Sequence, residues 1–400
     1  MKVPFSPPDI TETEIELVAE AMRSGWITTG PKTKEFENEI ARYCGAARTT
    51  CLSSATAAME LSLRLLGVGE GDEVITSAYT YTASASVIAH VGARPVLIDV
   101  DAGNPSMSPG KLKAAITKRT KAIIPVDLAG VPSDYDALRQ VLDEKKDIFC
   151  PNSPMQKALG RVAIVGDCAH SFGAEYKGSN VALCSDFACF SFHAVKNLTT
   201  AEGGAVVFGD IGDITADRIY EKFMLYSLHG QSKDALAKTS IGAWEYDIII
   251  PGYKCNMTDI TASMGLGQLS RYQALLQRRK EMVALYNSRF EGTAIKPIAH
   301  TAANYTGSHH LYIVTVDGLF EDIRNSIITD LGDNGISANV HYKPLPMMTA
   351  YKAMGYDIKD FPNAFDYYKK EITLPLHTLL SDEQINHVAT VLCASVDARK

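Results

Sequence analysis

The chain contains 400 residues, of which 46% are hydrophobic and 21% are charged, and its formal net charge is −7. The length favours two or three domains with a sizeable core, and the acidic balance excludes the basic surface by which proteins bind nucleic acid. No apolar run reaches the length of a membrane span, and the first residues lack the apolar core of a signal peptide, so we expect a cytoplasmic protein without a membrane partner.

The first predicted element is an amphipathic helix over residues 12–25. Apolar residues recur there at helical spacing, from Ile15 to Met22, and Gly25 ends the pattern. A turn-rich stretch from Trp26 to Pro31 follows. It suits a loop packed over a pocket as well as a linker that crosses the domain surface.

Between about residues 48 and 210, short apolar runs alternate with helical patterns, which is typical of βα units around a mostly parallel sheet. The predicted strands span residues 49–52, 73–77, 95–99, 122–126, 162–165, 187–190 and 205–208. The predicted helices span residues 83–90, 110–116 and 135–144. The segment 147–160 shows little periodicity and is predicted to be a loop or an addition to the basic unit.

After Gly212 the alternation lapses into longer helical stretches, and a second mixed unit follows. The stretches predicted after this point are helices at 213–228, 257–290 and 321–331, strands at 311–316 and 337–341, and a closing helix capped by Ser381. We therefore predict an α/β protein whose N-terminal arm and large domain span residues 1–255. A smaller α+β domain would span residues 256–400.

One lysine is notable for its setting. Lys196 follows the apolar run Phe187–Phe190 and is predicted at the end of that strand, with Ser191 five residues before it and two glycines after it. A lysine amine attacks a carbonyl only when it is unprotonated, and burial disfavours its ammonium form. Lys196 is therefore a candidate Schiff-base lysine, although an isolated lysine in such a turn is more often a surface residue.

Two further stretches could bind a cofactor. Residues 53–57 leave a predicted strand and open a helix, where backbone N–H groups and the helix dipole favour an anion such as phosphate. A plain helix N-cap explains the same residues. Asp167 follows the strand predicted at 162–165, where a carboxylate can hold a pyridine nitrogen protonated or can serve as an ordinary strand-end cap.

Taken in order, these segments resemble the sugar aminotransferases of the DegT/DnrJ type, which are fold-type I enzymes that use pyridoxal 5′-phosphate (PLP). The resemblance covers nearly the whole chain, and its most specific part is the pattern S-F-H-x-x-K-x-L/I-T-T-x-E-G-G at residues 191–204. Its other markers are the segments Ser24–Pro31, Ser53–Ala57, Gly166–His170, Gly252–Asn256 and His341–Pro344.

The resemblance implies roles for residues around the cofactor ring. Lys196 would be the catalytic lysine, and Asp167 would pair with the pyridine nitrogen. Tyr81 matches the position of an aromatic ring stacked on the cofactor. His170 would be a nearby hydrogen-bonding partner, and a satisfied structural histidine is the alternative.

The resemblance also implies how the cofactor phosphate is bound. It assigns Ala55, Thr56 and Ser191 to the phosphate of the same subunit. Asn256 would reach the phosphate of the neighbouring subunit's cofactor, which implies a homodimer with shared active sites. A plain Asn N-cap would explain Asn256 without any partner.

The substrate expected from the resemblance is a nucleotide-linked 4-keto-6-deoxy sugar, aminated from L-glutamate in amino-sugar or surface-polysaccharide biosynthesis. The matching substrate positions are Thr28, Thr29, His193, His341 and Tyr342. Family members that dehydrate sugars carry histidine in place of the lysine, so Lys196 argues against that subclass.

Two other functions are considered beside this one. The first is a regulator or scaffold that binds PLP without turnover, and the second is a PLP enzyme acting on amino acids. Amino-acid enzymes of this fold hold the α-carboxylate with an arginine from the C-terminal part, because its planar fork matches two oxygens. No arginine occurs between Asn325 and Asp397, which favours the sugar substrate.

Two patterns are set aside. The glycines of residues 67–71 precede a predicted strand instead of following one into a helix, which is the wrong geometry for a dinucleotide loop. His309 and His310 lack spaced carboxylate or cysteine partners, and the eight cysteines include no C-x-x-C pair. We therefore predict no metal site and no disulfide framework.

Overall fold

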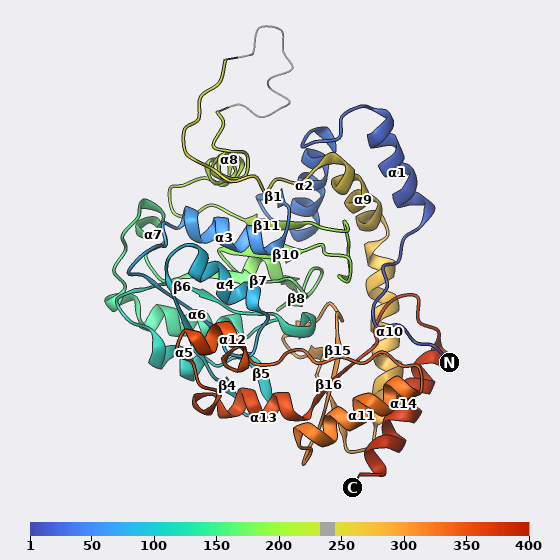
Figure 1. Cartoon of the computed structure of the whole chain (residues 1–400). Coiled ribbons are helices and arrows are strands. Elements are labelled where there is room, and N and C mark those ends of the chain that lie inside the picture. Colours follow the sequence, from blue (N-terminus) through green and yellow to red (C-terminus); the bar gives the residue numbers. More distant parts are fainter. Residues whose placement is uncertain (233–244, 400) are drawn as a thin grey trace.

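A seven-stranded sheet forms the centre of the protein, in the order β1-β11-β10-β7-β6-β2-β3 (Figure 1). The computed structural model describes residues 1–232 and 245–399. The strands are β1 (Arg48–Leu52), β2 (Glu73–Ser77), β3 (Arg94–Ile98), β6 (Thr120–Ile124), β7 (Ala163–Asp167), β10 (Phe187–Ser191) and β11 (Gly204–Phe208). Only β11 runs antiparallel to its neighbours in this sheet. The predicted α/β fold with a mostly parallel sheet is confirmed.

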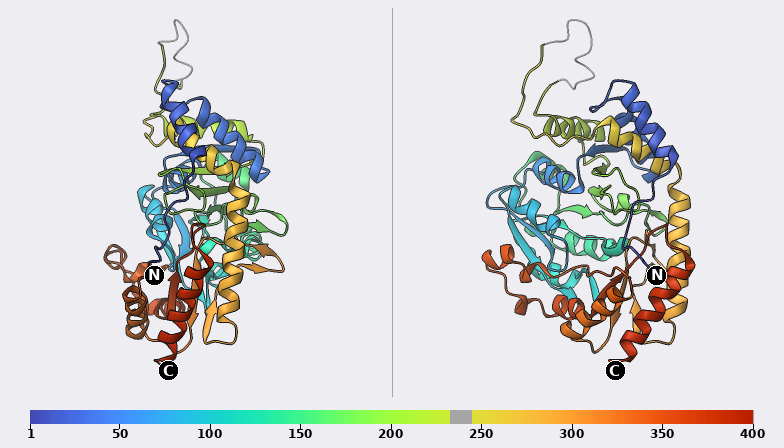
Figure 2. Two further views of the ribbon diagram at one scale, coloured as in Figure 1. Left: turned by 90° about the vertical axis from the view of Figure 1, so that its right-hand side faces the viewer. Right: turned by 45° about the vertical axis from the view of Figure 1, so that its right-hand side comes forward.

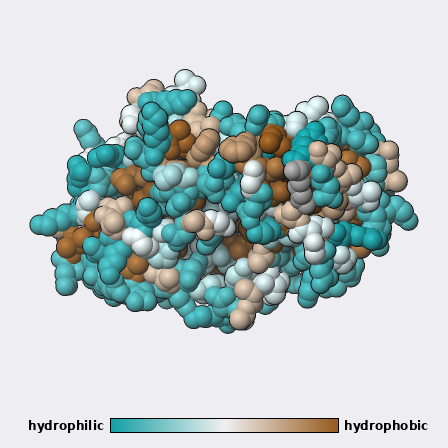
Figure 3. Space-filling view, turned by 90° about the horizontal axis from the view of Figure 1, so that it is seen from below, coloured by the Kyte–Doolittle hydropathy of each residue, from teal (hydrophilic) through white to brown (hydrophobic). Residues whose placement is uncertain are grey.

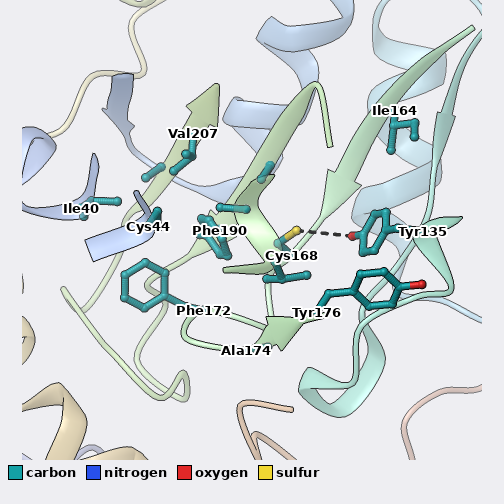
Figure 4. Close-up of a cluster of buried hydrophobic side chains, with 14 of the residues drawn as sticks. Ile40, Cys44, Tyr135, Ile164, Cys168, Phe172, Ala174, Tyr176, Phe190 and Val207 are labelled. Carbon is teal, nitrogen blue, oxygen red and sulfur yellow. Dashed lines mark hydrogen bonds between the residues drawn. The ribbon is translucent and has the colours of Figure 1, made fainter. Parts of the chain in front are cut away.

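Both faces of this sheet are buried, as is typical of parallel strands. Successive residues of a strand point to opposite faces, so Ile164 belongs to one hydrophobic cluster and Val165 to the other. Helices α2 (Pro31–Cys44), α5 (Pro109–Ala115) and α6 (Tyr135–Glu144) pack on the first face, part of which is drawn in Figure 4. Helices α3 (Ala55–Leu65), α4 (Thr82–His90), α7 (Pro154–Leu159) and α8 (Ala216–Ser227) pack on the second.

Two helices of the large domain were not predicted. The missed α2 begins at Pro31, directly after the turn-rich stretch, and ends at Gly45, which adopts a left-handed conformation with φ of 66°. Of the two alternatives predicted for residues 147–160, an addition to the basic unit fits better than a loop, because α7 forms within this segment. Ser153 caps this helix by accepting a hydrogen bond from the Gln156 N–H, and Pro154 occupies the first turn.

The long helical stretch predicted at 257–290 consists of two helices. They are α9 (Asp259–Ser270) and α10 (Tyr272–Phe290), and Arg271 separates them. Arg271 donates to Glu14 of α1 (Glu12–Arg23), and α9 packs against α1 and α2. Helix α10 then runs along the side of the molecule to the smaller sheet (Figures 1 and 2).

The smaller sheet is antiparallel and contains β12 (Ile295–Pro297), β15 (Tyr312–Val316) and β16 (Glu371–Leu374). Helices α10, α11 (Glu321–Asp333) and α14 (Asp382–Asp397) share its core, and Ser381 caps α14 as predicted. The strand predicted at 337–341 is wrong, because in the described structure Asn339 makes only a single bridge, to Thr373 of β16. The division at 255/256 stays a prediction.

The remaining elements are short. They are β4 (Val100–Asp101), β5 (Asn104–Met107), β8 (Glu175–Tyr176), β9 (Ser179–Asn180), β13 (Thr301–Ala302), β14 (Tyr305–Thr306), α12 (Thr349–Ala353) and α13 (Pro362–Lys370). Within residues 1–232 and 245–399, none of the helices combines the length and the apolar character that crossing a bilayer requires. The face drawn in Figure 3 is largely hydrophilic, with hydrophobic residues in separate small areas.

Candidate active site

A cavity of about 370 Å³ lies where the carboxyl ends of β2, β6, β7 and β10 meet, which is the usual place for a ligand in an open α/β sheet. Ten of the thirteen predicted site residues line it. They are Ala55, Thr56, Tyr81, Asp167, His170, Ser191, His193, Lys196, His341 and Tyr342. Residues predicted from separate stretches of sequence therefore meet in one cavity, although their individual roles stay predictions.

Lys196 and Asp167 form the charged centre of this cavity. Asp167 is the last residue of β7, whereas Lys196 lies in a bend five residues beyond the end of β10, so its predicted position at the strand end is corrected. Burial lowers the pKa of the Lys196 ammonium to about 8, and the charge of Asp167 opposes this shift. An appreciable fraction of this amine is therefore unprotonated near neutral pH.

Burial also raises the pKa of Asp167 above its usual value, but three partners oppose the shift. Ser84 Oγ donates a 2.6 Å hydrogen bond to Asp167 Oδ2, the Ala169 N–H donates to Oδ1 at 3.3 Å, and the charge of Lys196 is nearby. Two donors and a cation favour the carboxylate form. That form can pair with a protonated ring nitrogen.

His170 is held in one tautomer by its neighbours. The Ala129 N–H donates to its Nδ1 at 3.3 Å, so the ring proton lies on Nε2 and is donated to the Tyr342 hydroxyl at 3.2 Å. Burial keeps the pKa of His170 well below its usual value, and its ring therefore stays neutral. The ring centre lies 4.4 Å from that of His310, which also lines the cavity.

The first turn of α3 forms a cradle for an anion. Ser54 caps the helix by accepting a 3.0 Å hydrogen bond from the Ala57 N–H, and Ala55 and Thr56 contribute the first two N–H groups, which have no helical acceptor. Gly204 of β11 passes directly beneath this turn, since a Cβ there would lie 2.3 Å from the Ser54 carbonyl carbon. Only glycine permits so close an approach.

This donor set fits PLP. A partly buried amine, a hydrogen-bonded carboxylate and a helix N-terminus with unpaired N–H groups match an aldehyde, a ring nitrogen and a phosphate respectively. Ser191 and the exposed ring of Tyr81 face the same cavity. The Tyr81 ring is tilted by 43° to that of Tyr342, with ring centres 5.7 Å apart.

Three predicted site residues lie outside this cavity. Asn256 donates to the Thr29 hydroxyl, which in turn donates to the Met257 carbonyl oxygen, and the Asp259 N–H donates to the Thr28 carbonyl oxygen. The carboxylate of Asp259 holds the same turn by accepting from the N–H groups of Gly30 and Thr33. These contacts fix Thr28, Thr29 and Asn256 as one polar group that does not line this cavity.

Several cavity residues carry no recognisable sequence signal. Phe5 and Ser6 of the N-terminal segment reach the cavity, where the Phe5 ring stacks on His341 with centres 5.7 Å apart. His310 also lines it and is oriented by a 2.9 Å hydrogen bond between its Nδ1 and Asn197 Oδ1. Among the described residues, no group of His, Cys, Asp and Glu side chains is arranged to hold a metal ion.

No arginine occurs among the described residues that line the cavity. Two buried arginines from the second half of the chain are used structurally. Arg279 donates to the carbonyl oxygens of His309, His310 and Leu376, and Arg324 donates to those of Tyr368 and Glu371. Neither side chain is available to a substrate carboxylate.

Comparison with known proteins identifies relatives over the whole chain. Residues 8–393 match the model of the DegT/DnrJ/EryC1/StrS aminotransferase family. A spore coat polysaccharide biosynthesis protein of Bacillus subtilis strain 168, SpsC, is 37% identical over 392 residues, which cover 96% of this chain and 95% of the relative.

Solved structures of two proteins show the same fold. The putative sugar aminotransferase Spr1654 of Streptococcus pneumoniae in its PMP-form is 53% identical with a TM-score of 0.97, covering 99% of this chain and 100% of that one, and its PLP-form matches with a TM-score of 0.96. Helicobacter pylori PseC, an aminotransferase involved in pseudoaminic acid biosynthesis, is 26% identical with a TM-score of 0.87 over the full length of both chains.

Proposed function

We propose that this chain, a PLP-dependent sugar aminotransferase of the DegT/DnrJ/EryC1/StrS aminotransferase family, uses L-glutamate as its amino donor. The acceptor that we propose is a nucleotide-linked 4-keto-6-deoxy sugar. The observation that carries the proposal is the lining of the cavity. Lys196 and Asp167 share the lining with aromatic and neutral hydrogen-bonding groups and with Glu202, and the described lining contains no arginine. Such a surface suits sugar hydroxyls better than a carboxylate.

Different residues are proposed to bind the different groups of the cofactor. Lys196 would bind the aldehyde, Asp167 the ring nitrogen, and Ala55, Thr56 and Ser191 the phosphate. When bound, PLP supplies an electron-withdrawing ring that weakens a C–H bond next to the transferred nitrogen.

The chain's own contribution is proton transfer and orientation. With a pKa near 8, Lys196 Nζ can accept the proton of the glutamate α-carbon and can return a proton to the sugar carbon that gains the amino group. Hydrogen bonds from the Ser84 hydroxyl and the Ala169 N–H favour the charged form of Asp167. The neutral His170 donates to the Tyr342 hydroxyl, and both side chains line the cavity.

We also propose that two subunits share their sites. Thr28, Thr29 and Asn256 lie together outside the cavity of their own subunit, and a partner related by two-fold symmetry would present them to the other cavity. The homodimer and the cytoplasmic location stay predictions. A role as a regulator or scaffold is disfavoured because Lys196, Asp167 and Ser191 are all retained in one cavity.

The relatives support a pathway that builds amino sugars for a surface polysaccharide, since one is named for spore coat polysaccharide and another for pseudoaminic acid. The test is to incubate the purified enzyme with glutamate and a panel of nucleotide-linked keto sugars, and to identify the amino products by mass spectrometry. We expect a 4-keto-6-deoxyhexose to be aminated at carbon 4. Amination of pyruvate or an aromatic keto acid as efficiently as of every keto sugar would overturn the proposal.

A further inference from the structure

His341 lines the active-site cavity and is held from the side that faces the smaller sheet. Its Nδ1 lies 3.0 Å from Thr373 Oγ1, its N–H donates to Glu371 Oε2 at 3.1 Å, and Tyr79 donates to its carbonyl oxygen at 2.9 Å. Thr373 Oγ1 also shares a hydrogen bond with Glu371 Oε1. A continuous chain of hydrogen bonds therefore leads from Glu371 through Thr373 to the His341 ring.

The donor and the acceptor of each hydrogen bond between Glu371, Thr373 and His341 can be assigned. A backbone N–H can only donate, so Glu371 Oε2 is an acceptor. If Glu371 is neutral, its proton lies on Oε1 and is donated to Thr373, whose own hydroxyl proton is then directed to His341 Nδ1. In that arrangement the ring proton of His341 lies on Nε2, the nitrogen that has no protein partner within the described residues.

We propose that Glu371, acting through Thr373, is a positioning residue that keeps the proton of His341 on Nε2 and so makes this histidine a hydrogen-bond donor to the substrate. The group it would recognise is a keto or hydroxyl oxygen of the sugar, and this assignment of the ligand rests on the proposed function. If Glu371 is ionised, the donors and acceptors of these hydrogen bonds change places. Thr373 then donates to Glu371 and accepts from His341 Nδ1, which leaves Nε2 as an acceptor.

The surroundings of Glu371 favour the neutral form. The side chain is fully buried, and burial raises its pKa to about 8. The titratable groups that face it are Arg324 of α11, Tyr79, Tyr342, Tyr367 of α13 and His341. Arg324 is the one cation among these, and its guanidinium donates to the backbone oxygen of Glu371. Burial lowers the pKa of His341 to about 4, so its ring is neutral and has a single N–H to place.

The tautomer can be measured without any sugar substrate. Long-range ¹H–¹⁵N spectra of the PLP-loaded enzyme labelled with ¹⁵N-histidine report which ring nitrogen is protonated, and a His341→Gln variant assigns the signal. We expect the Nε2–H form at pH 7 and the Nδ1–H form above about pH 9, because Glu371 ionises between them. In Glu371→Gln, whose amide also donates to Thr373, the Nε2–H form should persist at both pH values. An Nδ1–H form at pH 7, or a Glu371→Gln spectrum that still switches, overturns the proposal.

Kinetics give the second readout. Thr373→Val removes the hydroxyl and should raise the KM for the keto sugar about tenfold, the loss of one hydrogen bond. The half-reaction with glutamate, followed by cofactor absorbance, should change less than about twofold. Thr373→Ser should restore the sugar KM, and Glu291→Gln, at an exposed site after α10, serves as the control.

Two failures can be told apart. If Thr373→Val slows the glutamate half-reaction as much as the sugar half-reaction, Thr373 is merely structural and the positioning role is wrong. If the unmodified enzyme aminates no keto sugar, the proposed function fails, while the spectra of the His341 ring still decide the tautomer.

Discussion

Ser84 Oγ donates a 2.6 Å hydrogen bond to Asp167 Oδ2, and both side chains are buried. The contact joins the first turn of α4 to the last residue of β7, and Thr80 Oγ1 lies 2.8 Å from Ser84 Oγ. Burial would otherwise push Asp167 toward its neutral form, so Ser84 helps to keep it charged. A neutral acid could not hold a ring nitrogen protonated.

Replacing Asp167 by asparagine should therefore remove activity while leaving the fold intact. We expect kcat to fall at least about 100-fold, equivalent to ~2.7 kcal/mol of transition-state stabilisation, with unchanged circular dichroism. Ser84→Ala should lower kcat less, by roughly three- to tenfold, because one of several stabilising partners is lost. Near-normal turnover of Asp167→Asn would show that Asp167 only caps its strand.

Lys196 should control the pH dependence of cofactor capture. Its lowered pKa of about 8 leaves about a quarter of the amine unprotonated at pH 7.5, far more than for an ordinary lysine. After the cofactor is removed, the rate of PLP rebinding should rise with pH through a midpoint near 8. A midpoint near the ordinary lysine value of 10.5 would contradict the shift, and Lys196→Ala should remain colourless and inactive at every pH.

Shared sites predict complementation between two inactive subunits. A heterodimer of one Lys196→Ala subunit and one Asn256→Ala subunit would contain one intact cavity if Asn256 serves its partner. We expect a mixed dimer, which has one intact site of two, to show up to about half of the activity of the unmodified dimer. No recovery on mixing, with heterodimers verified by mass spectrometry, would place Asn256 at the cavity of its own subunit or at none.

Glu37 should make stability depend on pH. Its buried carboxyl accepts 2.8 Å hydrogen bonds from the Cys51 N–H and the Tyr220 hydroxyl, yet burial raises its pKa from 4.5 to about 7. A carboxyl whose pKa is raised by folding contributes most stability below the unfolded value, and this is lost as pH rises through about 7.

Glu37→Gln removes this titration. Thermal unfolding should therefore show that the variant gains stability relative to the unmodified protein between pH 5 and pH 8, by several degrees. Glu20→Gln, at an exposed site of α1, should show no such gain. A constant difference between Glu37→Gln and the unmodified protein at all pH values would exclude the ionisation of Glu37 as the cause.

The strands of the large sheet and the cofactor chemistry were predictable from the sequence alone. Strands buried on both faces appear as short apolar runs, so all seven were predicted within two residues of their ends. The segments around Lys196, Asp167 and Ala55 are continuous in sequence, and their residue types carry their chemistry. The family and its PLP dependence could thus be identified before any coordinates.

Only the tertiary structure shows which residues from distant parts of the sequence contact the active-site cavity or the residues that line it. Phe5, Ser84, His310 and Glu371 have no local pattern that distinguishes them, because their roles arise from side chains that meet across different elements. The strand expected at 337–341 shows the same limit, since the only bridge formed there in the described structure joins Asn339 to Thr373 of β16. Local propensity fixes an element's type, but pairing between distant segments decides where it packs and which groups it brings to the cavity.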